Sequence, residues 1–451
     1  MPSSLATLLT ILFIVWAFRW TSRGDPAFLR GLWIPTIWVG IFASRMVGNW
    51  FGGETSSLDG SPLDRNIFLV LIFLGVRQLV RRRLNWDVLK RNNRAFVLFI
   101  AFCALSSVWA DFPFVAFKRW IKEVGTVVMV LLIATEPNPI QSVRKVFLRC
   151  AYVLVPLSIL FIKYYVEIGR TYDEWTGEAM FCGVATEKNA LGRLCFVSTL
   201  FLLSSLLETK QEGGWFTRLK RGLPQTLVLG MCAWLLLKAD SSTAKGCVAI
   251  GIMAFFLARW DFLRRSPKLA GVGSVALIIV SFLILVEPSV RKVIAEALGR
   301  RGDLTDRAYI WEGSFALETN PLIGCGYGSV WLTQRGRQLQ LKLKMAHSHN
   351  GFLETYLNTG LIGLSLLLAI VAAAGGNAVR RVISGEEGGA LLAALFFSCT
   401  IYNYTEVGFS NISIVGFLMW FLAVRAGGGL RPGPGGSRVG VTPDGTTALP
   451  G

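Results

Sequence analysis

The sequence is poor in charge and in histidine. Only 16% of its 451 residues are Asp, Glu, Lys or Arg, whereas 53% are hydrophobic. This balance excludes an ordinary soluble domain, in which charged residues make up about a quarter of the chain. The only two histidines, His347 and His349, stand together. A histidine pair in a chain that has no others favours a functional role over a structural one.

Several catalytic motifs are also missing. The sequence has no P-loop, no HExxH motif, no paired-cysteine zinc spacing and no Asp-x-Asp of the kind that holds the metal of a nucleotide sugar. These absences argue against ATP hydrolysis and zinc chemistry, so we expect neither a metal nor another cofactor. Asp303 and Asp306 are two carboxylates in a basic loop, which is weak support for a divalent ion site.

Long apolar runs recur along the chain, and charged or Gly/Pro-containing segments separate them. The runs lie near 4–18, 28–46, 66–80, 95–111, 122–135, 146–165, 188–207, 223–238, 244–260, 269–286, 350–374, 388–403 and 409–425. We therefore predict an all-α, polytopic membrane helix bundle with twelve or thirteen transmembrane helices. The first run lacks a basic leader and a small-x-small cleavage site, so we interpret it as a span rather than a signal peptide.

Basic residues in the short loops predict the orientation. The densest cluster lies at 81–94, which places this loop in the cytoplasm. Alternation from it puts 47–65, 166–187 and 287–349 on the outer side and the C-terminus inside; with thirteen spans, the N-terminus is outside. Because the net charge of +18 is spread over such loops and not over one amphipathic surface, we do not expect nucleic acid as a partner.

The chain is expected to form one membrane domain with one elaborated outer loop. We predict an N-terminal transmembrane bundle at 1–286, a large outer loop at 287–349, C-terminal transmembrane helices at 350–425 and a disordered cytoplasmic tail at 426–451. The tail is rich in Gly, Pro and Thr and cannot bury a core. Loops as long as 287–349 without a function are uncommon.

His347 and His349 stand where the long outer loop enters the apolar run at 350–374. An imidazole can act as a general base near neutral pH, and a helix N-terminus favours nearby negative charge. On one helix the two rings would point roughly 200° apart, so we expect different roles for them. We rank His349, which directly precedes Asn350, as the base and His347 as its helper; capping or structural histidines are the alternative.

Asn350, Glu354 and Asn358 recur at intervals of four residues. On a helix they form one polar stripe that enters the membrane. A carboxylate inside the membrane is costly and is a functional-site candidate by default. We expect Glu354 to orient a base or to pair with a cation; a purely structural pairing with an arginine is the alternative.

Four cations belong to the predicted outer face. Lys188 and Arg193 open the run 188–207, where they could hold a lipid-linked phosphate, and Arg193 lies deeper and is the better candidate. Lys245 and Arg307 are the other two. Interface anchors or solvated surface charges are the alternatives for these side chains.

The eight cysteines divide into two groups. Six lie inside apolar runs, where a small buried hydrophobic residue is the ordinary role. Cys182 and Cys325 lie in loops on the predicted outer side, which would allow a disulfide between them.

Four stretches of the sequence together carry a family resemblance. They are GSPLDR at 60–65, EKNALG at 187–192, the segment 307–311 followed by NPLIGCGYG at 320–328, and HNGFLE at 349–354 followed by GLIG at 360–363. In this order they resemble the O-antigen ligase and polymerase superfamily, especially its exopolysaccharide-polymerase branch, over most of the chain. The last two stretches, across one long outer loop, are the most specific.

The resemblance implies a bacterial inner-membrane glycosyltransferase that works on the periplasmic side without a metal or a nucleotide sugar. Its donor would be a glycan on undecaprenyl diphosphate, and His349 resembles the catalytic residue of the family. A sugar hydroxyl would attack the anomeric carbon and give its proton to His349. The diphosphate and the substrate would be bound by Arg193, Lys188, Lys245, Arg307 and Asn350.

Three alternatives remain at this point. The nearest is a ligase that transfers finished glycan to lipid A core instead of a polymerase that extends it. A polysaccharide transporter or lipid flippase is the alternative from another class, although transporters bind near the bilayer midplane and the polar residues here gather in the outer half. The third is an inactive scaffold. Membrane lipids and other polysaccharide-assembly proteins are the further candidate partners.

Overall fold

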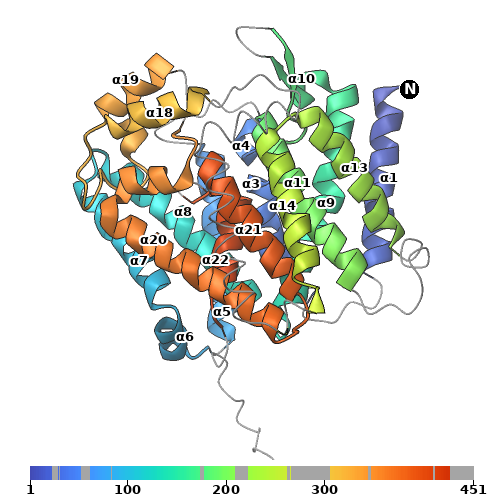
Figure 1. Cartoon of the computed structure of the whole chain (residues 1–451). Coiled ribbons are helices and arrows are strands. Elements are labelled where there is room, and N and C mark those ends of the chain that lie inside the picture. The colour runs from blue at the N-terminus through green and yellow to red at the C-terminus, as the bar shows by residue number, and fades with distance from the viewer. Residues whose placement is uncertain are drawn as a thin grey trace, which may run out of the picture.

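Helices form nearly all of the regular structure that the computed structural model describes (Figure 1). The structure describes residues 1–451 except 23–28, 30, 52–60, 83, 173–176, 209–221, 262–264, 266–304, 344–346, 410–411, 427–451 and the side chains of 305–309. The helices of the first half are α1 (Ser3–Thr21), α3 (Trp33–Phe42), α4 (Val47–Trp50), α5 (Pro62–Arg81), α6 (Trp86–Asn92), α7 (Arg94–Ser106), α8 (Pro113–Ala134), α9 (Pro139–Tyr164), α10 (Val166–Gly169) and α11 (Lys188–Glu208). Those of the second half are α13 (Leu223–Ala239), α14 (Ser242–Leu257), α18 (Thr305–Phe315), α19 (Gln334–Leu343), α20 (Gly351–Ile383), α21 (Gly389–Thr405) and α22 (Ile414–Ala423).

Four of the described helices are long and apolar enough to cross a membrane, namely α1, α9, α11 and α20. The bent pair of α6 and the helix that continues from Arg94 to Trp109, which meet at 91°, would make a fifth span. Five further apolar helices have 10–17 residues: α3, α13, α14, α21 and α22. The chain is thus an all-α, multi-pass membrane protein. The count of twelve or thirteen spans stays a prediction, and the predicted run 269–286 lies outside the described residues.

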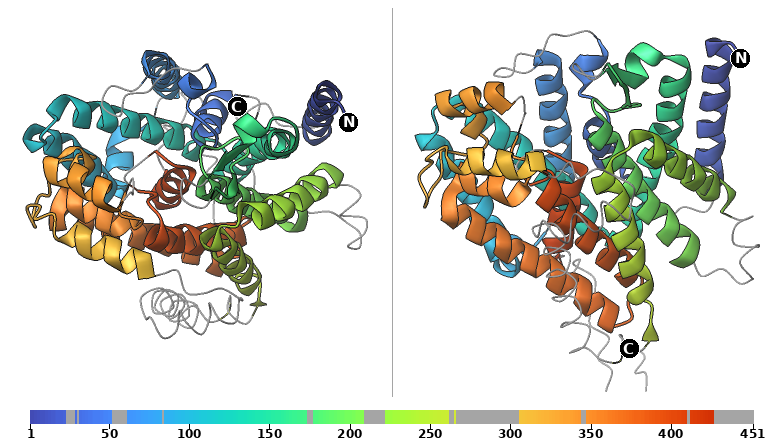
Figure 2. Two further views of the ribbon diagram at one scale, coloured as in Figure 1. Left: turned by 90° about the horizontal axis from the view of Figure 1, so that it is seen from above. Right: turned by 45° about the horizontal axis from the view of Figure 1, so that its top comes forward.

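The centre of the bundle is built by helices from both halves of the chain. Helix α11 packs against α9, α13, α14 and α21, and α20 packs against α7, α21 and α22. Two stacked rings, Phe147 of α9 and Phe201 of α11, lie 4.6 Å apart between centroids. In contrast, α1 stands at the edge of the bundle (Figure 2), where most of its surface is exposed. In a membrane protein, such an apolar surface faces lipid.

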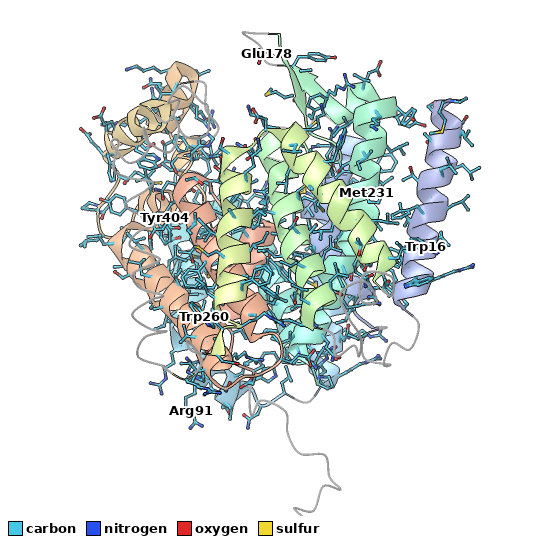
Figure 3. All side chains as sticks on the ribbon, turned by 45° about the vertical axis from the view of Figure 1, so that its right-hand side comes forward. Trp16, Arg91, Glu178, Met231, Trp260 and Tyr404 are labelled. Atoms are coloured by element: carbon cyan, nitrogen blue, oxygen red, sulfur yellow. The ribbon has the colours of Figure 1, made fainter. Side chains whose placement is uncertain are left out.

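The two ends of the bundle carry different elements. Arg91 and Glu178 lie at opposite ends in Figure 3, so the loops 81–94 and 166–187, which the basic residues predict on opposite sides of the membrane, are far apart. The end with Glu178 also carries α18, α19 and a short antiparallel hairpin of β1 (Arg170–Tyr172) and β2 (Ala179–Phe181) (Figure 1). We call these the Arg91 end and the Glu178 end.

Helix α20 contains a break at Gly360, where φ is 63° and ψ is −165°. The backbone N–H groups of Leu361 and Ile362 consequently donate to the carbonyls of Pro321 and Leu322, at 2.8 and 3.1 Å. A Cβ at Gly360 would lie only 2.2 Å from the carbonyl carbon of Leu322. Glycine is therefore required here both for its positive φ and for close backbone contact.

The segment 320–328 also binds the turn of α20 that precedes the break. The N–H groups of Cys325 and Gly326 donate to the carbonyls of Leu357 and Asn358, at 3.2 and 2.9 Å. The carbonyls near a helix break lack their usual partners, and this loop supplies them. Two stretches of the family resemblance, 320–328 and 360–363, are thus joined by backbone hydrogen bonds.

The disulfide that the loop positions of Cys182 and Cys325 would allow is not formed, because all eight cysteines are free. The Cys182 sulfur accepts from the guanidinium of Arg45 at 3.5 Å, and the Cys325 thiol donates to the carbonyl of Leu357 at 3.2 Å. Burial raises the pKa of the Cys325 thiol to about 12. Little thiolate is therefore available near neutral pH for oxidation.

Candidate functional site

The histidine pair directly precedes helix α20. Asn350 is the N-cap, and its Oδ1 accepts the N–H groups of Phe352 and Leu353 at 3.0 and 3.1 Å. This cap gives Oδ1 of Asn350 a structural role. Since neither histidine is on the helix, their rings do not point apart as a shared helix would require. Their centroids lie 4.2 Å apart.

His347 supports the backbone at His349. The φ of His349 is 50°, a left-handed conformation that is unusual for a residue other than glycine. Its N–H donates to Nδ1 of His347 at 3.2 Å. Neutral His347 therefore carries its proton on Nε2. A helper role for His347 stays a prediction, and this contact gives it a geometric basis.

A carboxylate that the sequence analysis missed lies beside His349. Oε2 of Glu406 is 3.2 Å from Nδ1 of His349, and Oε1 accepts from Nδ2 of Asn189 at 3.0 Å. The Glu406 side chain is 5% exposed, whereas that of His349 is 25% exposed. A buried carboxylate thus contacts Nδ1 of an imidazole whose side chain is partly exposed. The available signal was an acidic residue between the apolar runs 388–403 and 409–425.

Helix α11 contributes a second residue to this region. Arg193 lies one turn after Asn189, as Tyr402 of α21 lies one turn before Glu406. The guanidinium of Arg193 is 3.4 Å from the Tyr402 hydroxyl, and the carboxylate of Glu406 is close enough to act on it electrostatically. The predicted phosphate ligand Arg193 therefore lies in the same region as the histidine and its carboxylate.

Glu354 fixes the chain just before His349. Its Oε2 accepts both the N–H and the hydroxyl of Ser348, at 3.2 and 2.7 Å, and its Oε1 accepts Nε1–H of Trp331 at 2.6 Å. Ser348 is fully buried, and its carbonyl accepts Nε1–H of Trp311 at 3.1 Å. Hydrogen bonds from neutral groups thus occupy both oxygens, and it is Glu406, not Glu354, that contacts the histidine ring.

The stripe of polar residues continues one turn further. Asn358 is buried, and its Oδ1 accepts the N–H groups of Ser329 and Val330 at 2.8 and 3.1 Å. Its Nδ2 donates to the carbonyl of Glu354 at 2.8 Å. The predicted stripe therefore faces the loop that carries Trp331, as an intramembrane polar stripe must face protein or water.

The other predicted cations differ in position. Lys188 is the first residue of α11, directly before Asn189, and is half-buried. Lys245 instead forms an ion pair with Asp240 at 2.9 Å, with both side chains largely exposed. Arg307 lies in α18, but its side chain is outside the described part of the structure.

The histidine region also has the donor set of a metal site. Among the described residues, ligand atoms of His347, His349 and Glu406 all lie within 4.8 Å of one another. Two imidazoles and a carboxylate are ligands that zinc and other divalent transition metals accept. The sequence motifs did not predict this grouping, because the carboxylate comes from a distant part of the chain.

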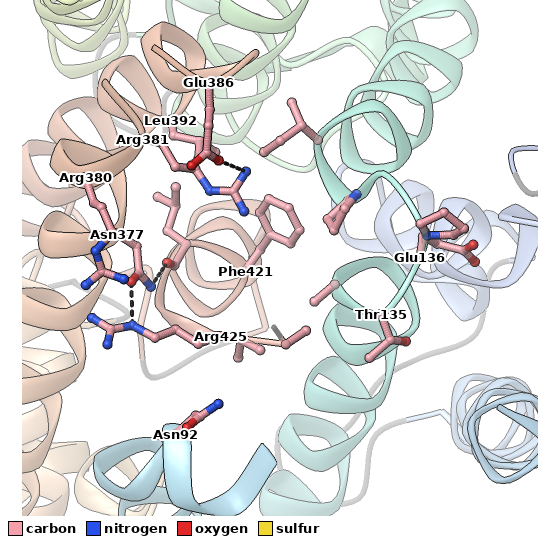
Figure 4. Close-up of a pocket in the computed structure, with 17 residues that line it drawn as sticks. Asn92, Thr135, Glu136, Asn377, Arg380, Arg381, Glu386, Leu392, Phe421 and Arg425 are labelled. Atoms are coloured by element: carbon pink, nitrogen blue, oxygen red, sulfur yellow. Dashed lines mark hydrogen bonds and ion pairs between the residues drawn. The ribbon is translucent and has the colours of Figure 1, made fainter. Parts of the chain in front are cut away.

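A cavity beside Asn92 lies at the Arg91 end, and neither histidine lines it; Figure 4 shows its lining. It has a volume of about 640 Å³ and is lined by Asn92 and by residues of the ends of α8, α20 and α22. Its polar side chains contact one another: Arg381 pairs with Glu386 at 3.4 Å, and Nε of Arg425 donates to Asn377 at 2.6 Å. This cavity contributes no residue to the histidine region.

Comparison with known proteins agrees with the motifs. The O-antigen ligase family matches residues 225–368, a range that includes both histidines and Glu354 but neither Arg193 nor Glu406. The exopolysaccharide production protein ExoQ of Rhizobium meliloti (strain 1021) is 26% identical over 283 residues, which are 60% of this chain. The match spans 62% of that relative's length. These findings confirm the predicted resemblance to the O-antigen ligase and polymerase superfamily.

Proposed function

We propose that this protein is a membrane glycosyltransferase that polymerises or ligates glycan from an undecaprenyl-diphosphate-linked donor. It would act at the periplasmic face of the bacterial inner membrane, in exopolysaccharide or O-antigen biosynthesis. The observation that carries the proposal is the contact between the partly accessible His349 and the buried Glu406, at 3.2 Å. It supports general base catalysis in a chain that matches the O-antigen ligase family.

The contact of Glu406 with Nδ1 determines which nitrogen of His349 can act as the base. With Nδ1–H donated to the carboxylate, Nε2 of His349 is the basic atom. The acceptor sugar hydroxyl loses its proton to Nε2 while its oxygen forms a bond to the anomeric carbon of the donor. The bond between that carbon and the diphosphate oxygen breaks, and the lipid diphosphate leaves with the electron pair. Glu406 stabilises the imidazolium that forms.

Helix α11 is the best-placed element to bind the leaving diphosphate. It begins at Lys188, and Arg193 lies beside the end of α21. An ammonium, a guanidinium and a helix N-terminus all favour phosphate oxygens. The negative charge that develops on the leaving group can be neutralised by these groups, so the proposed mechanism requires no metal.

The direct test is reconstitution of the purified full chain in liposomes with extracted lipid-linked oligosaccharides. Longer lipid-linked glycan identifies a polymerase, and modified lipid A core identifies a ligase. His349→Ala should lower the rate of formation of either product about 10²–10⁴-fold while leaving insertion and the size-exclusion profile unchanged. An unchanged distribution of glycan lengths in this variant would refute the catalytic role of His349. Glycan movement across the bilayer without a new glycosidic bond would identify a transporter instead.

A further inference from the structure

A smaller cavity between α5 and α8 is rich in positive charge. It has a volume of about 230 Å³, and four of its twelve lining residues are cations: Arg65, Lys118, Arg119 and Lys122. None of the twelve described lining residues is acidic. Lys118 and Lys122 are separated by one helical turn, a spacing at which like charges destabilise a helix. A bound anion would remove this repulsion.

The two lysines are held at the cavity by aromatic rings. Nζ of Lys118 lies 5.0 Å from the ring centroid of Phe114, and Nζ of Lys122 lies 5.6 Å from that of Phe68. Cation–π contacts of this kind fix the position of an ammonium group. The nearby carboxylate of Asp64 is buried, accepts the N–H of Gly48 at 2.8 Å and acts electrostatically on Lys122.

Arg119 connects the cavity to the loop beneath the histidine region. Its guanidinium donates to the carbonyl of Gly328, in the loop that also carries Trp331, the partner of Glu354. The position of this guanidinium is therefore set by the family motif 320–328. Arg65, Lys118 and Lys122 can therefore be substituted without removing the hydrogen bond from Arg119 to this loop.

Apart from Ser61, the rest of the cavity lining is apolar, and part of it is exposed at the surface of the molecule. Leu69 of α5 is 49% exposed, and Phe114 of α8 is 72% exposed. Phe73, one turn after Leu69 on α5, is also exposed, at 67%. In a membrane protein a surface of this kind contacts hydrocarbon. A ligand that satisfies both parts of the cavity has an anionic head and an apolar tail.

We propose that the α5–α8 cavity binds the phosphate headgroup of a membrane lipid, with the lipid tail lying along Leu69 and Phe114. Arginine and lysine together suit phosphate oxygens, which accept several charge-assisted hydrogen bonds at once. The lining shares no residue with the region of His349 and Glu406. The proposal therefore does not depend on the glycosyltransferase function.

The test is photolabelling of the full chain in nanodiscs with a prenyl diphosphate that carries a diazirine on its tail. Mass spectrometry should find the label on peptides of α5 and α8. Lys118→Gln combined with Lys122→Gln should reduce this labelling about tenfold, because two charge-assisted contacts are lost. The matched control is Lys163→Gln with Lys238→Gln, since these lysines also lie over aromatic rings but outside the cavity. The control should label like the wild type.

An additional variant and two competing compounds distinguish a lipid phosphate from other ligands. Lys118→Arg with Lys122→Arg should retain labelling, which separates loss of charge from loss of folding. Equal labelling by a neutral prenyl alcohol, or labelling of α5 and α8 that the Gln variants do not reduce, would overturn the proposal. Displacement by inorganic diphosphate as effective as by unlabelled prenyl diphosphate would also overturn it, because the site would then recognise a soluble anion.

Discussion

Two buried carboxylates approach the histidine segment from different parts of the chain, and their partners differ in kind. Glu354, in the first turn of α20, accepts hydrogen bonds from Ser348 and Trp331. Glu406, which follows α21, contacts the imidazole of His349 and the amide of Asn189. They are equally buried, at 3% and 4% exposure. Burial alone therefore does not distinguish the two carboxylates, whereas the ionisable partner of Glu406 does.

The largest effect should come from His349, which contacts Glu406 and directly follows Ser348, the partner of Glu354. His349→Ala removes the proposed base, and the glycan-transfer rate should fall about 10²–10⁴-fold. The rate is measured in liposomes from the appearance of new glycosidic bonds. His347→Ala, which removes the ring that supports the turn, should reduce the rate less. Equal losses in both variants would mean that the pair acts as one unit.

Glu406→Gln should have the next largest effect on the rate. The amide retains the shape and the contact with Asn189 but cannot stabilise an imidazolium, so kcat should fall about 100-fold. The thermal midpoint should change little. Partial recovery in Glu406→Asp would support a charge effect, whereas wild-type kcat in Glu406→Gln would leave the two carboxylates without a functional difference.

Glu354→Ala should act mainly on stability. Ser348 and Trp331 would lose their buried acceptor, which costs about 1–3 kcal/mol for each group left unsatisfied. Thermal unfolding in detergent should show a clear decrease in midpoint. The kcat per folded molecule should decrease less than in Glu406→Gln. The opposite ranking would make Glu354 the catalytic carboxylate.

A smaller effect is expected from the support behind Glu406. Asn189→Ala removes one hydrogen bond to its carboxylate, a loss of about 0.5–1.5 kcal/mol and thus at most about tenfold in rate. Asn189→Asp places a second negative charge there and should be worse than alanine. A rate in Asn189→Asp equal to that of the wild type would argue against a charged Glu406.

Metal removal should have no effect, since the proposed mechanism uses the imidazole as a base. Dialysis against EDTA should leave the transfer rate unchanged, with a dialysed sample given zinc as the comparison. Loss of activity that zinc restores would give Glu406 another role. The carboxylate would then be a metal ligand with His347 and His349, whose donor atoms already lie within 4.8 Å of one another.

The local features of this molecule were predictable from the sequence. The run at 188–207 became α11 (Lys188–Glu208), because apolar content and length define a spanning helix. The start of α20 after the histidines was also predictable, since Asn350 is a strong N-cap residue and Gly351–Phe352 begin an apolar run.

The contacts between distant segments were not predictable. Glu406 lies 57 residues after His349 and belongs to no motif, so only the packing of α21 against α11 and α20 reveals it. The ion pair of Lys245 with Asp240 was missed for a different reason. A spacing of five residues does not face one side of a helix, and here Asp240 lies outside α14 in a left-handed conformation.

The break in α20 affects how hybrids between this chain and similar proteins should be built. Four backbone hydrogen bonds join 321–326 to 357–362 across Gly360, so neither segment forms its structure without the other. A hybrid that takes the loop from one relative and the helix from another would join two segments whose backbones are not adapted to hydrogen-bond with each other. The exchangeable unit is therefore the loop together with the helix turns on either side of the glycine.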